Sequence, residues 1–177
     1  MLKKLLFAFM LSQALYATAQ PTQVFVVRHA ERAAEPKDDP ALSPEGAARA
    51  ELLAETLAAA NVRTIITTHY RRTQETAAPL AKKLGITPTV IANRPGELPA
   101  HITEVVAEAR KASGVVLVVG HSNTVAGIIA GLSSSKPAQL CETTYANIFI
   151  ATPAAPALPA TQIKFGKLDV APTAGCQ

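Results

Sequence analysis

The sequence predicts an α/β fold, a three-layer α/β/α sandwich with a mainly parallel sheet and an antiparallel C-terminal edge. The apolar runs 24–27 and 115–119 show no alternation with polar residues. Such runs are typical of strands covered on both faces in a parallel sheet. Strand and helix patterns also alternate through the middle of the chain, as crossovers between parallel strands require. Two extended segments near the C-terminus favour a hairpin at the sheet edge.

The expected elements follow one another in a regular order. A helix should begin at Ser43, because serine suits the cap and Pro44 suits the first helical position. The next helix should end before Gly85, and Pro79 should kink it or shift its start. The full order is strand 23–28, a helix from 43 with a buried stripe at Ala50, Leu53, Leu57 and Ala60, strand 62–67, helix 71–84, short strand 87–91, helix 102–112, strand 115–119, helix 123–132, and edge strands 145–152 and 161–168.

The N-terminal residues predict export. Lys3 and Lys4 precede an apolar segment that ends in Ala17-Thr18-Ala19, a small-x-small pattern. This arrangement indicates a secretory signal peptide over 1–19 with cleavage after Ala19. The apolar segment is too short to span a bilayer. We therefore expect an exported (periplasmic or secreted) protein without a stable membrane anchor, with one domain over 20–177.

Charge and cysteine content bound the partners. The signal peptide holds two lysines and no acid, so its removal lowers the formal net charge from +4 to +2. This charge is too small to indicate a nucleic-acid partner. Cys141 and Cys176 remain, and in an oxidising compartment they can form one disulfide or stay as unrelated thiols. No segment shows a coiled-coil pattern.

Histidines follow the ends of both buried strands. His29 comes directly after Arg28 and the first apolar run, and His121 comes after the second. Because the carboxyl ends of parallel strands meet at one sheet edge, we expect the two imidazoles to face each other there. Arg71 and Arg72 begin a helix that follows another strand, so one of them should face the same crevice.

This set of side chains suits a phosphate dianion. Guanidinium groups match phosphate oxygens and stay charged at every working pH. A neutral imidazole can attack phosphorus and hold the group as phosphohistidine, while arginines and a second histidine stabilise the transition state. With these fixed cations we expect no metal and no cofactor. Zinc is the alternative use of the histidines, but the sequence has no H-x-H, HExxH or Cys/His spacing for it.

Four motifs share this order and spacing with a known family. They are Arg-His-Ala-Glu at 28–31, Leu-Ser-Pro-Glu-Gly at 42–46, Arg-Thr-Gln-Glu-Thr-Ala at 72–77 and Val-Gly-His-Ser-Asn at 119–123. The chain resembles a small, capless member of the histidine phosphatase (phosphoglycerate mutase-like) superfamily. The resemblance implies that His29 is the phosphorylated nucleophile and that Arg28, Arg72 and His121 complete the phosphate pocket. It implies a metal-independent phosphoric monoester hydrolase whose partner is a small-molecule or surface-displayed phosphate ester.

The general acid is the main departure from this family. A carboxylic acid would protonate the leaving oxygen and would need a raised pKa at neutral pH. No motif marks it, and the candidates are Glu97, Glu31, Glu104 and Asp39. The family's substrate cap is nearly absent as well, so we expect an open pocket that admits bulky substrates.

Three other functions stay open. A mutase must retain the phosphoryl group and exclude water, which an open pocket disfavours. A phosphate-binding module without turnover is compatible with the missing acid. A protein phosphohistidine phosphatase fits the short chain but fits poorly with export.

Overall fold

The computed structural model describes residues 21–169. The predicted signal peptide 1–19 and Cys176 lie outside these residues, so the cleavage after Ala19 and the Cys141–Cys176 disulfide stay predictions. Within 21–169, no helix has both the length and the apolar character that crossing a bilayer requires.

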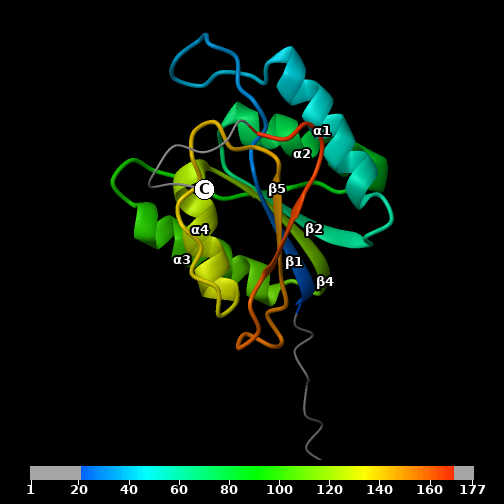
Figure 1. The fold of residues 1–177 in the computed structure, drawn as a ribbon, viewed down its shortest axis with the longest axis vertical. Helices are drawn as coiled ribbons and strands as arrows, with labels where there is room; N and C mark the ends of the chain where they lie inside the picture. Colours follow the sequence, from blue (N-terminus) through cyan, green and yellow to red (C-terminus); the bar gives the residue numbers. More distant parts are fainter. Residues whose placement is uncertain (1–20, 170–177) are drawn as a thin grey trace, which may run out of the picture.

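A six-stranded sheet forms the middle layer, in the order β3-β2-β4-β1-β5-β6 (Figure 1). Its strands are β1 (Pro21–Arg28), β2 (Val62–Thr67), β3 (Thr89–Val90), β4 (Gly114–Gly120), β5 (Asn147–Ala151) and β6 (Thr161–Lys164). Strands β1 to β4 run parallel to one another, whereas β5 and β6 are antiparallel to their neighbours. The predicted fold class, with its antiparallel C-terminal edge, is confirmed.

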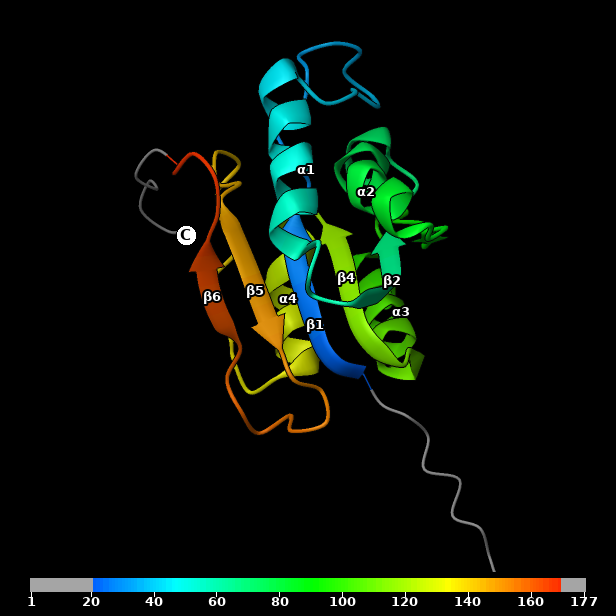
Figure 2. The same cartoon turned by 90° about the vertical axis from the view of Figure 1, so that its right-hand side faces the viewer.

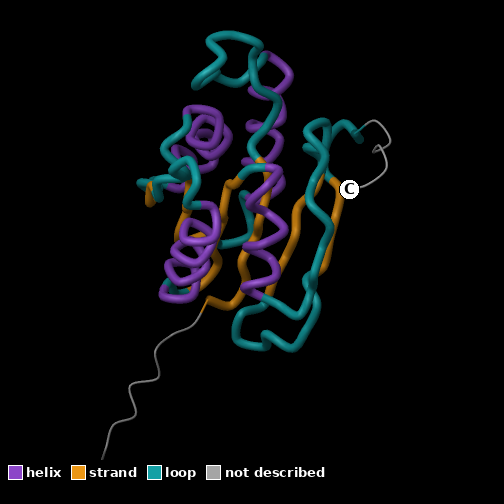
Figure 3. The backbone as a smooth tube through the Cα atoms, turned by 90° about the vertical axis from the view of Figure 1, so that its left-hand side faces the viewer, coloured by secondary structure: helices purple, strands orange, loops and turns teal. Residues whose placement is uncertain are grey.

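Two pairs of helices cover the two faces of the sheet (Figures 2 and 3). They are α1 (Pro44–Leu57) and α2 (Arg71–Leu84) on one face, and α3 (Leu98–Lys111) and α4 (Ser122–Leu132) on the other. Each pair closes a separate apolar core. Phe25 and Val27 of β1 belong to the core under α1 and α2, and Val24 and Val26 belong to the core under α3 and α4. Because both faces of β1 are covered, its sequence shows no polar alternation.

Several predicted boundaries match the structure. Strand β2 and helix α2 have the predicted bounds, and α2 runs through Pro79 without a shift of its start. Helix α1 begins at Pro44, and the Ser43 hydroxyl accepts a hydrogen bond from the Gly46 backbone N–H at 3.2 Å. The cap and the first turn therefore agree with the sequence pattern.

Other details of the prediction were wrong. Helix α3 begins at Leu98 rather than at 102, because Pro99 sits in the first turn, where no backbone N–H is needed. Strand β5 is not an edge strand, because β6 pairs with its outer side and forms the edge instead. Strand β3 has only two residues, and β6 ends at Lys164.

Candidate active site

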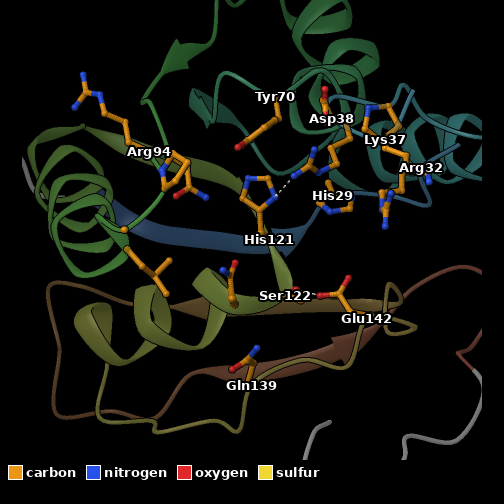
Figure 4. A pocket seen from close by; sticks show the side chains of 17 residues that line it. His29, Arg32, Lys37, Asp38, Tyr70, Arg94, His121, Ser122, Gln139 and Glu142 are labelled. Atoms are coloured by element: carbon orange, nitrogen blue, oxygen red, sulfur yellow. Dashed lines mark hydrogen bonds between the residues drawn. The ribbon is translucent and has the colours of Figure 1, made fainter. Parts of the chain in front are cut away.

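The register of β1 and β4 places the two predicted histidines side by side. Arg28 is paired with Gly120 across these parallel strands, and the His29 backbone N–H donates to the Gly120 carbonyl at 2.9 Å. The next residues, His29 and His121, therefore leave the sheet at the same edge. Their ring centroids lie 5.4 Å apart at an interplanar angle of 65° (Figure 4). The predicted convergence of the two imidazoles is present in the structure.

The local contacts of His29 leave one ring nitrogen free to react. Its Nδ1 lies 2.8 Å from the Ala30 carbonyl oxygen. Since a carbonyl only accepts, Nδ1 carries the hydrogen and Nε2 keeps its lone pair. Burial lowers the pKa of His29 to about 3, although the Ala30 carbonyl opposes this shift. At neutral pH the ring is therefore neutral, which is the form a nucleophile needs.

His121 is held by a chain of hydroxyl groups. Its Nε2 lies 3.0 Å from the Thr68 hydroxyl, which in turn lies 2.9 Å from the Thr73 hydroxyl. The other ring nitrogen, Nδ1, lies 3.5 Å from a guanidinium nitrogen of Arg72. Burial lowers the pKa of His121 to about 2, and the neighbouring His29 adds to the shift. This ring too is neutral, with its Nδ1 side directed at Arg72.

Arg72, and not Arg71, faces the histidines. Its guanidinium carbon lies 4.2 Å from the centroid of the Tyr70 ring and its Nη1 lies 3.8 Å from Asp39 Oδ1. Arg71 instead donates to Glu75 on the exposed side of α2. Stacking on Tyr70 holds the fork of Arg72 in place beside the two imidazoles.

Arg28 lies behind the site rather than in it. Its side chain is buried and donates to the carbonyls of Cys141 and Thr144 at 2.7 and 3.2 Å. A further guanidinium nitrogen donates to Glu142 at 2.8 Å, and the group lies over the Tyr145 ring. Of the four predicted site residues, Arg28 is the one that does not line the cavity. In this structure it anchors the 141–145 loop beside His29.

Glu142 is a cavity residue that sequence reasoning missed. It accepts hydrogen bonds from Arg28 and from the Ser122 hydroxyl at the start of α4. Partial burial raises its pKa, but the Ser122 hydrogen bond and the Arg28 charge outweigh this and keep the pKa below its usual value. No motif surrounds Glu142 in the sequence. It reaches the site only because the chain returns to the sheet beside β1.

The four carboxylates considered as general acid are all outside the lining of the cavity, although Asp39 lies 3.8 Å from Arg72. Glu31 forms a two-pronged ion pair with Arg49. Asp39 accepts from the Arg71 backbone N–H at 3.0 Å. Glu97 is exposed and paired with an arginine, and Glu104 is exposed on α3. None of the four lines the cavity, whose carboxylates among the described residues are Asp38 and Glu142.

The histidines open into a polar cavity of about 580 Å³ (Figure 4). Its lining beyond the histidines and Arg72 is mostly polar and charged: Arg32, Lys37, Asp38, Tyr70, Asn93, Arg94, Ser122, Asn123, Gln139 and Glu142, with Pro40, Pro95, Gly96 and Leu98. A phosphate group fills a small part of this volume, so the cavity also has room for a leaving group. In residues 21–169, no three His, Cys, Asp or Glu side chains are grouped to hold a metal ion.

The comparisons with known proteins agree with this fold. Residues 24–94 match the sequence model of the histidine phosphatase superfamily (branch 1). Over these residues, somewhat less than half of the chain, the sequence is similar to that superfamily, and its fold is shared by solved members. Phosphatase activity is the broad class of function that this similarity supports. A search of curated protein sequences returned no match.

Solved structures share the fold at low sequence identity. The protein histidine phosphatase SixA complexed with tungstate has a TM-score of 0.59 and 19% identity, over 80% of this chain and 96% of that chain. A putative phosphohistidine phosphatase SixA from Agrobacterium tumefaciens has a TM-score of 0.57 and 21% identity, over 85% of this chain and 99% of that chain. A mycobacterial glucosyl-3-phosphoglycerate phosphatase has a TM-score of 0.55 and 15% identity, over 81% of this chain and 98% of that chain. At these identities the likeness establishes the fold.

Proposed function

We propose that this protein is a metal-independent phosphatase that hydrolyses phosphate monoesters through a phosphohistidine on His29. The observation that carries the proposal is the pair of neutral imidazoles 5.4 Å apart, with Nε2 of His29 unprotonated and Arg72 beside them. This geometry supplies a nucleophile and fixed donors around a space suited to one phosphoryl group.

The first step is the transfer of the phosphoryl group to His29. Its Nε2 attacks phosphorus, the N–P bond forms, and the bond from phosphorus to the leaving oxygen breaks. Arg72 stabilises the charge on the equatorial oxygens, and His121 adds a hydrogen bond to them once its Nδ1 carries a proton. The Ala30 carbonyl holds the Nδ1 hydrogen, so it stabilises the positive charge that the phosphorylated ring acquires.

The second step is the hydrolysis of the phosphohistidine. Water attacks phosphorus, the N–P bond breaks, and inorganic phosphate leaves with the neutral imidazole restored. Glu142 is ionised at neutral pH because its pKa is lowered. Its carboxylate can therefore accept a proton from the attacking water. An ionised Glu142 does not protonate the leaving oxygen in the first step. Esters of acidic alcohols should therefore react faster than esters of alkyl alcohols.

A generic aryl phosphate tests the proposal. We expect the wild type to release phosphate in the presence of EDTA, and we expect His29→Asn to lose at least about 10³-fold in kcat, because the covalent route is removed. Circular dichroism of the variant checks that it is folded. Activity of His29→Asn close to wild type would remove the nucleophile assignment, and loss of wild-type activity in EDTA would remove the metal independence.

A protein phosphohistidine phosphatase is the second candidate. It is supported by the two SixA structures, whose chains are covered to 96% and 99%, and by the open cavity. The two candidates are separated by comparing the kcat/KM of the enzyme for a phosphohistidine-bearing protein with its kcat/KM for an aryl phosphate. Tight phosphate binding without turnover of either substrate would instead indicate a binding module.

We also propose export. The predicted signal peptide 1–19 supports this, and N-terminal sequencing of the protein made in a secreting host tests it. A mature N-terminus at Gln20 is the expected result, and a protein retained in the cytoplasm with residues 1–19 intact would contradict it.

A further inference from the structure

The mouth of the cavity carries cations that the phosphoryl group does not use. Arg72 lies deep, against the imidazoles, whereas Arg32, Lys37 and Arg94 are exposed side chains that line the cavity. Figure 4 shows Arg32 and Lys37 together on the His29 side, and Arg94 beyond His121 on the opposite side. Two exposed carboxylates, Asp38 and Glu142, line the cavity with these three cations, and Glu142 is already paired with Arg28.

Arg32 and Lys37 differ from the other cations of the site in having no hydrogen-bonded or ion-paired partner, although the charge of Arg32 helps to lower the pKa of Glu142. Neither side chain makes a hydrogen bond or a salt bridge to any residue within 21–169. Arg28 is held by the 141–145 loop, and Arg94 is paired with Glu97 at 3.5 Å. The charges of Arg32 and Lys37 are therefore available to a ligand without the loss of an existing contact.

The backbone under Arg32 is nevertheless fixed. Arg32 forms an antiparallel bridge with Leu42, and the Ala33 backbone N–H donates to the Ala41 carbonyl at 2.9 Å. On the other side of Arg32, the Glu31 carbonyl accepts from the Ser43 backbone N–H at 2.9 Å. A cation on a fixed backbone can recognise an anion at a defined place, because only the side chain has to be ordered on binding.

The space beside these cations continues away from His29. Arg32 and Lys37 also line a second hollow, which they share with Ala33, Ala34 and Tyr145. A leaving group that runs from the phosphoryl site toward Arg32 therefore meets two positive charges that no ion pair within residues 21–169 holds.

We propose that the substrate is a phosphate monoester whose leaving group carries a second anionic group, bound by Arg32 and Lys37. The inference rests on the proposed phosphatase function and names the substrate class for the same site. A carboxylate or a second phosphate has the required charge, since the guanidinium fork of Arg32 matches either group. A neutral polar leaving group would leave both cations unused.

Matched pairs of esters test this class. We would compare ω-carboxyalkyl phosphates with ω-hydroxyalkyl phosphates of the same length, over chains of two to five carbons. For at least one length, the expected kcat/KM of the carboxylated ester exceeds that of its hydroxyl partner by about 10- to 100-fold, the range of a charge-assisted hydrogen bond. Added salt should reduce this ratio, because the cations are exposed.

Variants assign the preference to its residues. In Arg32→Gln/Lys37→Gln, the ratio should fall to about one, mainly through a higher KM for the carboxylated ester. Arg63→Gln is the matched control, because Arg63 is an exposed arginine at the opposite end of β2, and it should keep the wild-type ratio.

Two results would overturn the inference. One is hydrolysis of the hydroxyl esters with no preference for carboxylated esters at any length. The other is a preference that survives Arg32→Gln/Lys37→Gln, or that Arg94→Gln removes instead. Neither result contradicts the proposed phosphatase activity itself. Absence of any His29-dependent hydrolysis in either series contradicts the proposed function and this substrate class together.

Discussion

At the scale of single residues, the site is built around two imidazoles that the fold keeps uncharged. His29 and His121 are only 4% and 5% exposed, and burial lowers the pKa of each far below that of a free histidine. The backbone then selects which nitrogen of His29 is available, through the Ala30 carbonyl. Nucleophilicity here follows from desolvation and one hydrogen bond rather than from a neighbouring base.

Thr68 should act as a positioning residue for His121. Removal of its hydroxyl in Thr68→Val leaves Nε2 of His121 without its buried partner, so the ring loses a fixed tautomer and orientation. We expect a decrease in kcat of about tenfold, a smaller change in KM, and recovery in Thr68→Ser, which keeps the hydroxyl. A structural role alone predicts a lower melting temperature with no recovery of kcat in the serine variant.

Arg72 should be irreplaceable by lysine. An ammonium group carries the charge but lacks the planar fork and the stacking on Tyr70. We expect Arg72→Lys to reduce kcat/KM for an aryl phosphate by about 100-fold. The adjacent Arg71→Lys, on the exposed side of α2 and paired with Glu75, should stay within about twofold of wild type. Equal losses in the two variants would contradict the placement of Arg72 at the phosphoryl group.

At the scale of elements, the helix that starts at Pro44 fixes the segment after His29. A Cβ built on Gly46 would lie 2.0 Å from the Glu31 carbonyl oxygen, closer than atoms can approach. The same carbonyl accepts from the Ser43 backbone N–H. The glycine in the Leu-Ser-Pro-Glu-Gly motif therefore allows α1 to pack directly on the segment that carries Glu31 and Arg32.

Gly46→Ala should separate these two elements. The added methyl group must push α1 away from Glu31, because the atom it meets is backbone. We expect the free energy of unfolding to fall by about 2 kcal/mol or more, measured by urea unfolding, together with a lower kcat/KM. Glu51→Ala, an exposed position on the same helix, should change stability by less than about 0.5 kcal/mol. A Gly46→Ala protein as stable as wild type would contradict the close approach.

The sequence predicted those elements whose pattern is decided locally. The cap at Ser43, the end of α2 at Gly85 and the apolar strands β1 and β4 each carry their signal within a few residues. The convergence of His29 and His121 also followed, because it depends only on the parallel edge. The hairpin of β5 and β6 was predicted as well, but the interior position of β5 was not, since no local pattern tells which of the two strands pairs with β1.

At the scale of the whole molecule, Glu142 shows what sequence patterns cannot reach. It comes from the loop between α4 and β5, and it meets Arg28 across 114 residues of chain. Arg28 was predicted to complete the phosphate pocket, but its guanidinium turns toward this loop and does not line the cavity. A direction of this kind follows from tertiary packing, which no local spacing encodes.

The two buried histidines of the site should also make the fold sensitive to mild acid, in addition to His101, whose pKa burial lowers as well. Their pKa values are about 3 and about 2 in the folded state against 6.5 in the reference state. The unfolded chain therefore binds more protons once the pH falls below about 6.5, and the stability decreases as pH falls. When the pH falls from 7.5 to 5.5, the two histidines together should lower the free energy of unfolding by about 3 kcal/mol.

Urea unfolding at these two pH values measures the effect. The double variant His29→Asn/His121→Asn should lose much less stability than wild type over the same interval, whatever its absolute stability. Equal losses in the two proteins would show that other groups cause the acid sensitivity.

The most direct test of the central claim is to trap the phosphorylated enzyme. Wild-type protein is mixed with a ³²P-labelled phosphate monoester, quenched in alkaline detergent within milliseconds to seconds, and mapped by peptide mass spectrometry. The account predicts an acid-labile, base-stable label on His29 that appears before phosphate is released and is absent from His29→Asn. Phosphate release with no label on His29, or with a label on another residue, would contradict it.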